Sequence, residues 1–234
     1  MATRDDHTIF SGGRDLMLSL PVAPDTTTDL TILCLGAHCD DIEIGCGATL
    51  LTLLNRYTNV HVHWHVLTST PARAEEAQAA ASDFCAGAAS ASITVHEFRD
   101  GYLPYEGAAI KDTFEAIKPT VSPDLIFTHY RSDAHQDHRL IGELTWNTFR
   151  DHQILEYEIP KWDGDLGRPS VFVDIDPVHA ARKIELLQQH YNSQQRKHWF
   201  TDDLFHSLMR LRGMESHSPT QLAEAFYAHK LKLV

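Results

Sequence analysis

Short apolar runs alternate with longer, more polar segments along most of the chain. The apolar runs have the length and continuity of strands buried on both faces, and they cover residues 31–36, 60–67, 92–98, 124–129, 154–159 and 171–175. The longer segments have helical character at residues 48–57, 71–88, 108–118, 138–149 and 178–190, and most of the chain after them is also expected to be helical. Strands that alternate with helices predict βαβ units with right-handed crossovers. We therefore expect an α/β protein of three layers, with a mainly parallel sheet covered by helices on both faces.

The chain before the first predicted strand lacks this regularity. Gly12-Gly13, Pro21 and Pro24 precede a run of Asp and Thr, which predicts an irregular N-terminal arm over residues 1–29. Nothing after the arm has the pattern of a repeat or a linker, and 234 residues fit the usual size of one domain. Residues 30–234 are therefore predicted to form a single domain.

The charge balance narrows the class of protein. There are 20 Lys and Arg against 32 Asp and Glu, a formal net charge of −12, which argues against general binding to nucleic acids or anionic membranes. The four cysteines form no Cys-x-x-Cys pair, and the sequence has neither a secretory leader pattern nor a long apolar run of membrane-spanning length. These features predict a reduced, cytoplasmic protein without membrane insertion.

The first predicted strand is followed directly by an imidazole and two adjacent carboxylates, His38, Asp40 and Asp41. In open α/β sheets ligands bind beyond the carboxyl ends of strands, so polar residues here are candidates for a site. Adjacent carboxylates stay ionised only if a cation or hydrogen bonds offset their repulsion, which a bound divalent metal does. The alternative interpretation is a turn with two solvated aspartates. Gly45-Cys46-Gly47 lacks the spacing of a dinucleotide fingerprint and indicates close backbone packing at a helix start.

A second polar cluster follows the fourth predicted strand. His135, Asp137 and His138 lie at the junction between this strand and the next helix. His138 could reach a metal together with His38 and Asp41. Two His and one carboxylate leave coordination positions open, which is the pattern of catalytic zinc. A surface loop would explain either cluster alone, but two clusters at two strand ends favour a metal site.

Both clusters resemble the signature motifs of a known family. His38-Cys39-Asp40-Asp41 resembles the His-Pro-Asp-Asp motif of the LmbE/PIG-L deacetylases, and His135-Gln136-Asp137-His138 resembles their His-x-Asp-His motif. Weaker similarity extends over most of the chain from about residue 30, including residues 73–76, 183–194 and 223–226. The resemblance implies a Rossmann-like fold and metal-dependent hydrolysis of N-acyl groups, usually with zinc and on sugars or glycosides.

The resemblance also implies roles by motif position. His38, Asp41 and His138 would bind the metal, which we expect to be Zn²⁺, with Fe²⁺ as the alternative. Asp40 would be the general base that takes a proton from the attacking water and returns it to the leaving amine.

Three further residues of the motifs complete these expectations. His135 would stabilise the tetrahedral oxyanion as an imidazolium, a kind of contribution worth about 3–4 kcal/mol in hydrolases, and Asp137 would orient its ring. Cys39 stands where the family has Pro. We expect a neutral, packed thiol there, and the alternative is a thiolate that binds the metal or is oxidised.

Other residues near the motifs are candidates for substrate contacts. These are Arg73, Asp133, Trp162 and His190. For Arg73 the alternative is an ion pair with a neighbouring Glu, and for His190 it is exposure on a helix. His61, His63 and His65 alternate along a predicted strand, which a polar strand face near the edge of the sheet explains; the alternative is a second metal site.

Together these features predict a zinc-dependent N-deacetylase, a hydrolase of linear amide bonds. Its expected partner is a small molecule, an N-acetylated amino sugar, glycoside or glycan precursor, and a homo-oligomer remains open. One alternative is an amidase of the same family that acts on a thiol conjugate or an antibiotic intermediate. Another is a metal-binding family member without catalysis, which is disfavoured because mere binding does not need a base and an oxyanion residue.

Overall fold

In a computed structural model that describes residues 19–232, seven strands form one sheet in the order β3-β2-β1-β4-β5-β7-β6. The strands are β1 (Leu30–Gly36), β2 (Val60–Thr68), β3 (Ser90–Phe98), β4 (Leu125–His129), β5 (Ile154–Tyr157), β6 (Val171–Asp174) and β7 (Ala223–Tyr227). The helices are α1 (Asp41–Arg56), α2 (Pro71–Phe84), α3 (Gly107–Ile117), α4 (Gln136–Thr148), α5 (Pro177–His190) and α6 (Asp202–Glu215), with short 3₁₀ helices η1 (Leu103–Glu106) and η2 (Lys118–Thr120). Neighbouring strands from β3 to β5 are parallel, whereas β7 is antiparallel to both β5 and β6. The predicted α/β fold with a mainly parallel sheet is confirmed.

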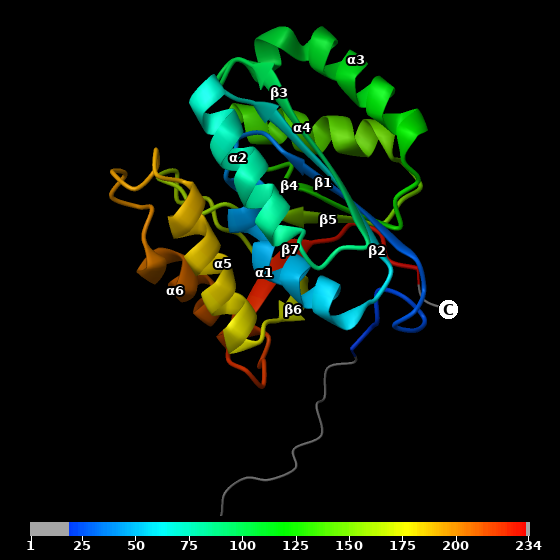
Figure 1. The fold of residues 1–234 in the computed structure, drawn as a ribbon, viewed down its shortest axis with the longest axis vertical. Helices are drawn as coiled ribbons and strands as arrows, with labels where there is room; N and C mark the ends of the chain where they lie inside the picture. Colours follow the sequence, from blue (N-terminus) through cyan, green and yellow to red (C-terminus); the bar gives the residue numbers. More distant parts are fainter. Residues whose placement is uncertain (1–18, 233–234) are drawn as a thin grey trace, which may run out of the picture.

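Helices cover both faces of the sheet, and the central strand β1 shows why. Ile32 and Cys34 pack with apolar side chains of α1, α2 and α5, whereas Leu33 and Leu35 pack with those of α3 and α4. Successive side chains of a strand point to opposite faces, so an apolar run without alternation needs a helical layer on each side. Figure 1 shows α1, α2 and α5 together on one side of the sheet and α3 and α4 on the other.

The first helix starts earlier than the sequence indicated. α1 begins at Asp41, not at residue 48, and thus includes Gly45 and Gly47. Glycine is a poor helix former, but here it lets the helix approach its neighbours: a Cβ on Gly45 would overlap the ring of Tyr157, and one on Gly47 would lie 2.7 Å from Phe84. Close backbone packing at this point is confirmed, and tertiary contact overrides the local propensity.

The C-terminal part is not wholly helical as expected. Residues 223–227 form β7, although Ala and Glu favour helices. All five residues are buried, and the Glu224 carboxylate accepts hydrogen bonds from the backbone N–H groups of Ala48 and Thr49 in α1. Lys183 donates to the same carboxylate and to Ile44 O, both over 2.6 Å. This buried pair fixes β7 against α1, which no local sequence pattern shows.

Two further expectations concern the N-terminal arm and membrane insertion. Of the predicted arm, residues 1–18 lie outside the described residues, and residues 19–29 contain bends and turns without a helix or strand. Within residues 19–232, no helix combines the length and the apolar character needed to cross a membrane.

The topology brings the two polar clusters together. β1 continues through α1 to β2 on one side, and its neighbour on the other side is β4. The carboxyl ends of two adjacent parallel strands that are wound in opposite directions frame a crevice, where ligands bind in open α/β sheets.

Candidate metal and catalytic site

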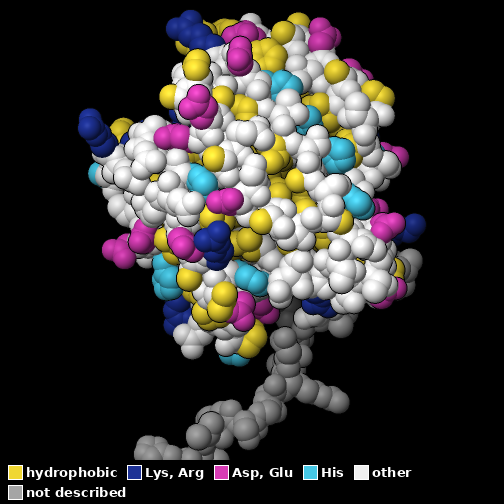
Figure 2. All heavy atoms as spheres, in the orientation of Figure 1, with side chains coloured by type: hydrophobic (Ala, Val, Ile, Leu, Met, Phe, Trp, Pro, Cys, Tyr) yellow, Lys and Arg dark blue, Asp and Glu magenta, His cyan; other side chains and the backbone are white. Residues whose placement is uncertain are grey.

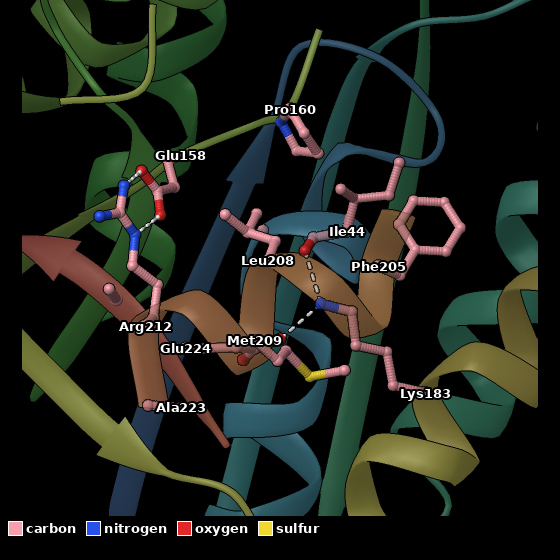
Figure 3. Close-up of a pocket in the computed structure, with 12 residues that line it drawn as sticks. Ile44, Glu158, Pro160, Lys183, Phe205, Leu208, Met209, Arg212, Ala223 and Glu224 are labelled. Carbon is pink, nitrogen blue, oxygen red and sulfur yellow. Dashed lines mark hydrogen bonds and ion pairs between the residues drawn. The ribbon is translucent and has the colours of Figure 1, made fainter. Parts of the chain in front are cut away.

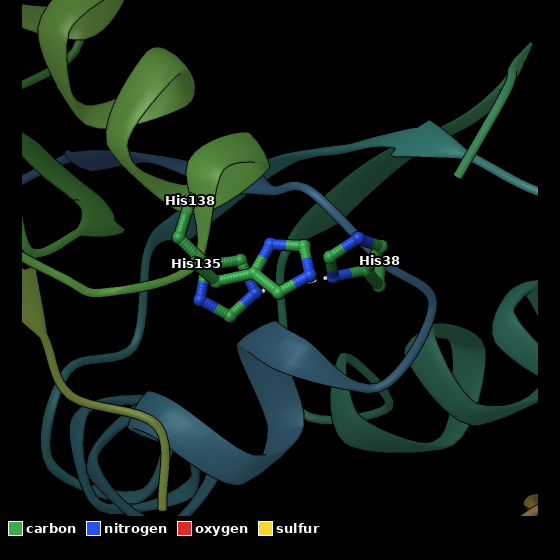
Figure 4. A group of neighbouring side chains, drawn as sticks. All are labelled: His38, His135 and His138. Atoms are coloured by element: carbon green, nitrogen blue, oxygen red, sulfur yellow. Dashed lines mark hydrogen bonds between the residues drawn. The ribbon is translucent and has the colours of Figure 1, made fainter. Parts of the chain in front are cut away.

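Three side chains from the two motifs meet at this crevice. His38 Nδ1 lies 3.1 Å from His138 Nε2 and 3.2 Å from Asp41 Oδ2, and His138 Nε2 lies 3.5 Å from Asp41 Oδ2. Figure 4 shows the rings of His135 and His138, from the start of α4, turned toward the ring of His38, which comes from the loop after β1. All three members of the triangle are at most 9% exposed.

The donor set of this triangle fits a divalent cation. Ligand atoms of a tetrahedral zinc, with bonds of about 2.0–2.1 Å, lie about 3.3 Å from one another. Burial alone lowers the pKa of His38, but Asp41, Asp100 and Asp137 together raise it well above its ordinary value. The pocket therefore favours a positive charge at this point, which either a proton or a metal ion supplies.

Each imidazole of the triangle also has a carboxylate beside its other ring nitrogen. His138 Nδ1 lies 3.1 Å from Asp133 Oδ2, and His38 Nε2 lies 3.3 Å from Asp137 Oδ2. Such carboxylate–histidine pairs orient metal-binding histidines and fix which ring nitrogen keeps its lone pair. Here they leave His138 Nε2 and His38 Nδ1 free to bind a cation.

Asp40, the neighbour of Asp41, has a different partner. Arg73, at the start of α2, donates from Nη2 to Asp40 Oδ1 over 2.7 Å. Burial lowers the pKa of Arg73, but Asp40 and Cys39 outweigh this effect and raise it. Arg73 thus pairs with the candidate base and not with Glu75 or Glu76.

His135 occupies the N-cap of α4. Its Nδ1 accepts a hydrogen bond from the backbone N–H of Asp137 over 3.3 Å, so the ring proton belongs on Nε2. Burial, together with the neighbouring His138 and His38, lowers the pKa of His135. This direction favours a neutral ring with Nε2–H as a donor over the expected imidazolium.

Asp137 does not orient the ring of His135 as expected. Its carboxylate accepts from the backbone N–H groups of Gly101, over 2.7 Å, and Leu103, over 3.2 Å, and it faces His38. These bonds anchor the loop that follows β3 over the site. The same loop brings Asp100 Oδ1 to 3.2 Å from His38 Nε2.

His129 belongs to the site, although the sequence analysis gave it no role. Its ring is fully buried and stacks on His138 with centroids 4.0 Å apart. Its Nε2 accepts from the N–H of Ala37 over 2.9 Å and lies 3.1 Å from Asp41 Oδ2. Two acceptor atoms at this distance repel each other unless a positive charge lies beside them, which again favours a cation at Asp41. His129 is the last residue of β4, and this place at the carboxyl end of a strand is the sequence feature that could have predicted its role.

The remaining predicted residues lie in different surroundings. Asp133 is almost fully buried and bonded to protein groups, so it is not free to contact a substrate. Trp162 is 76% exposed, beside His198. His190 Nε2 lies 2.8 Å from Asp83 Oδ2, between α5 and α2, and its contact with a substrate stays a prediction.

Cys39 is packed, as expected. Its thiol donates to Thr68 O over 3.4 Å, and burial raises its pKa to about 12, so the thiol is neutral. The neighbouring carbonyl of Cys39 accepts a hydrogen bond from the hydroxyl of Tyr191, which also contacts Glu43 over 2.5 Å. These contacts hold the turn around Cys39, the position at which the family has Pro.

The histidine row on β2 is a polar strand face. His61, His63 and His65 lie on the face of β2 opposite Trp64, next to the edge strand β3, where His96 stacks on His65. Figure 2 shows a row of histidine side chains on the surface over these strands. The candidate metal-binding groups found among residues 19–232 do not include this row; they comprise His38, Asp41, Asp100, His129, His135, Asp137 and His138.

A narrow hollow lies between α1, α6 and β7 (Figure 3). Arg212 donates to both carboxylate oxygens of Glu158 over 2.7 Å, and Lys183 is held by Glu224 and Ile44 O. Because the polar groups of this hollow bond one another, it offers no free group for a ligand.

The fold is an α/β sheet with a buried cluster of His and Asp at the carboxyl ends of β1 and β4. Comparison with known proteins identifies the family. The profile described as "PIG-L: GlcNAc-PI de-N-acetylase" matches residues 33–149, which include both motifs, and the chain belongs to this family of deacetylases. The Escherichia coli (strain K12) protein named "Uncharacterized deacetylase YaiS" is 28% identical over 174 residues, which cover 68% of this chain and 89% of that protein.

Two solved structures share the fold at low sequence identity. N,N'-diacetylchitobiose deacetylase from Pyrococcus horikoshii has a TM-score of 0.65 at 19% identity, with 85% of this chain and 83% of that chain covered. The 4-carboxy-2-hydroxymuconate hydratase GalB from Pseudomonas putida KT2440 has a TM-score of 0.70 at 17% identity, with 88% and 98% covered. Because one fold carries a deacetylase and a hydratase, the reaction must be argued from the site.

Proposed function

We propose that the chain is a Zn²⁺-dependent N-deacetylase that removes the acetyl group from an amino sugar, a glycoside or a glycan precursor. The observation that carries the proposal is the triangle of His38 Nδ1, Asp41 Oδ2 and His138 Nε2, whose edges measure 3.1–3.5 Å. Two His and one carboxylate are a ligand set of catalytic zinc sites, in which further positions stay open.

A divalent ion held by these three residues supplies a Lewis acid that polarises the amide carbonyl and acidifies water. Asp40 takes the proton of the attacking water as the new C–O bond forms, and delivers a proton to the amine nitrogen as the C–N bond breaks. Arg73 occupies Asp40 Oδ1, so Oδ2 is the oxygen available for proton transfer. The products are acetate and a free amine.

His135 stabilises the charge that develops on the carbonyl oxygen. The N-cap hydrogen bond from the Asp137 backbone fixes its tautomer, so Nε2–H is a donor before substrate binds. A donor that is already oriented needs no reorganisation in the transition state. A neutral imidazole is suited to this position because the helix N-terminus disfavours a cation there.

The family and the aromatic side chains at the surface support an amino sugar as substrate. Trp162 and Tyr105 are 76% and 77% exposed, and Tyr105 lies in η1, whose first residue, Leu103, donates its N–H to Asp137. Exposed rings provide an apolar surface for a sugar face, and Arg73 places a cation beside Asp40. An amidase acting on a thiol conjugate or an antibiotic intermediate is the alternative in the same family.

The test combines metal binding with a panel of amides. Zinc-loaded protein is assayed for acetate and amine release from N-acetylated amino sugars and, in parallel, from larger N-acyl amides. Release from the sugars supports the proposal, and release only from the larger amides supports the alternative. Asp40→Asn is expected to keep the zinc but lose turnover. Failure of the intact protein to bind any divalent metal would overturn the proposal.

A further inference from the structure

Lys161 lies between two carboxylates in the loop that joins β5 to β6. Its Nζ is 2.8 Å from Asp133 Oδ2 and 2.6 Å from Asp165 Oδ1, and it also donates to Ile159 O over 3.3 Å. The three protons of the ammonium group therefore have three acceptors. The side chain is only 13% exposed, so these contacts replace most of its contact with water.

Asp133 connects this lysine to the site. Its Oδ1 accepts from the backbone N–H of His135 over 2.7 Å, and its Oδ2 lies 3.1 Å from His138 Nδ1. One carboxylate thus orients a metal-site histidine and receives the ammonium from the loop.

We infer that Lys161 is a positioning residue that couples the β5–β6 loop, and with it Trp162, to the metal-binding residue His138 through the carboxylate of Asp133. The inference rests on the proposed function, because it takes His138 as a metal ligand. Coupling between two binding events is reciprocal. Metal binding should therefore order the loop, and a sugar bound on the loop should raise the affinity for the metal.

A lysine that served only to fold the loop would need Asp165 alone. Asp165 already joins the loop to the turn before α4, since its Oδ2 accepts from the N–H of Ala134 over 2.6 Å. The contact with Asp133 is additional, and it is the one that reaches the ring of His138. Without the ammonium, two carboxylates would face each other with no cation between them, and the buried Asp133 would lose its alignment.

Four variants separate coupling from folding. Lys161→Met removes the ammonium, Lys161→Arg keeps a cation, and Asp165→Asn weakens the anchor of the loop without touching Asp133. Lys111→Met is the matched control, since Lys111 pairs with Glu115 on the surface of α3. For each protein, the Kd for Zn²⁺ is measured by competition with a chelating dye. Hydrogen exchange of residues 158–170 is measured with and without zinc.

Lys161→Met is expected to raise the Kd for Zn²⁺ about tenfold, the low end of the effect of losing an outer partner of a metal ligand. Lys161→Arg is expected to recover most of this loss, and Lys111→Met to match the wild type. Zinc should slow exchange of the loop in the wild type and in Asp165→Asn, which keeps the contact between Lys161 and Asp133, but not in Lys161→Met. Asp165→Asn should keep a Kd within about twofold of the wild type, because Asp133 retains its cation.

An unchanged Kd in Lys161→Met, or an equal response of its loop to zinc, would overturn the inference. If circular dichroism shows that Lys161→Met does not fold, Asp165→Asn decides: a loop that no longer responds to zinc there, although Lys161 still faces Asp133, rejects the coupling. Zinc-dependent ordering of the loop without deacetylation of any amide would support the coupling and reject the proposed function. A wild type that binds no zinc rejects both.

Discussion

Arg73 and Asp40 form an ion pair in which both side chains are largely buried, at 18% and 7% exposure. The pair joins the first turn of α2 to the residue that precedes α1, and its 2.7 Å hydrogen bond engages only one oxygen of the carboxylate. Arg73, which belongs to a different crossover of the sheet, therefore sets the position of the second oxygen. This is the oxygen proposed to move protons.

Arg73→Met is expected to reduce kcat/KM about 10- to 100-fold while zinc content is unchanged. Loss of one partner from a partly buried ion pair costs about 1–3 kcal/mol, which corresponds to this range if the cost falls on the transition state. Steady-state kinetics with metal analysis checks it. Arg182→Met is the control, because Arg182 pairs with Glu185 at an exposed site and should leave kinetics unchanged. Equal kinetics in both variants would remove Arg73 from the site.

His135→Ala is expected to lower kcat about 10²- to 10³-fold, as does the loss of one oxyanion donor in other hydrolases. His135→Gln retains an N–H donor and should recover part of this loss. The measurement is kcat at saturating substrate with zinc content determined for each variant. A decrease of less than about threefold in the alanine variant contradicts the assignment.

Metal removal should destabilise the protein. A ligand that binds only the folded state at 100 times its Kd adds about 2.7 kcal/mol to the free energy of unfolding. Denaturant unfolding with chelator and with excess zinc measures this difference. His138→Ala removes one corner of the triangle, so zinc should not stabilise it; an equal gain in that variant would place the zinc elsewhere.

Gly45→Ala is expected to lower the free energy of unfolding by about 1–3 kcal/mol or more, because the new methyl group would overlap the ring of Tyr157. Gly107→Ala is the matched control: it is helical, and a Cβ there meets nothing within 4 Å. That substitution should be neutral or stabilise the fold by up to about 1 kcal/mol. Urea denaturation of both variants tests the contrast, which would be absent if α1 could shift away from β5.

The free energy of unfolding should decrease in mild acid because His65 becomes protonated. Burial, with smaller effects of His96 and His63, lowers the pKa of His65 from 6.5 to about 4. The unfolded chain therefore binds this proton at higher pH than the folded protein. The contribution is fully present above pH 6.5 and is lost as the pH falls toward 4, by about 2–3 kcal/mol.

The comparison with His65→Leu isolates this effect from the other histidines. Free energies of unfolding at pH 7.5 and pH 4.5 are measured for both proteins. The wild type should lose about 2–3 kcal/mol more than the variant over this range. An equal loss in both would mean that His65 accepts its proton in the folded state at its ordinary pKa.

The sequence by itself determined the parallel core of the sheet and the location of the site. Strands such as β1 and β4 are continuous apolar runs, and polar residues at their carboxyl ends form a crevice in any sheet wound this way. His38, Asp41 and His138 could therefore be predicted to meet, although 100 residues separate the two histidines.

Only the tertiary structure decided how the groups around the site are bonded. His129 joined the site because β4 ends beside β1, and Asp137 turned to the loop after β3 because free backbone N–H groups lie there. β7 became a strand because it pairs with β5 and β6, and its Glu224 binds Lys183 and the backbone of α1. The partners of a buried polar group are chosen by proximity in space, whereas local propensity and periodicity report only on neighbours along the chain.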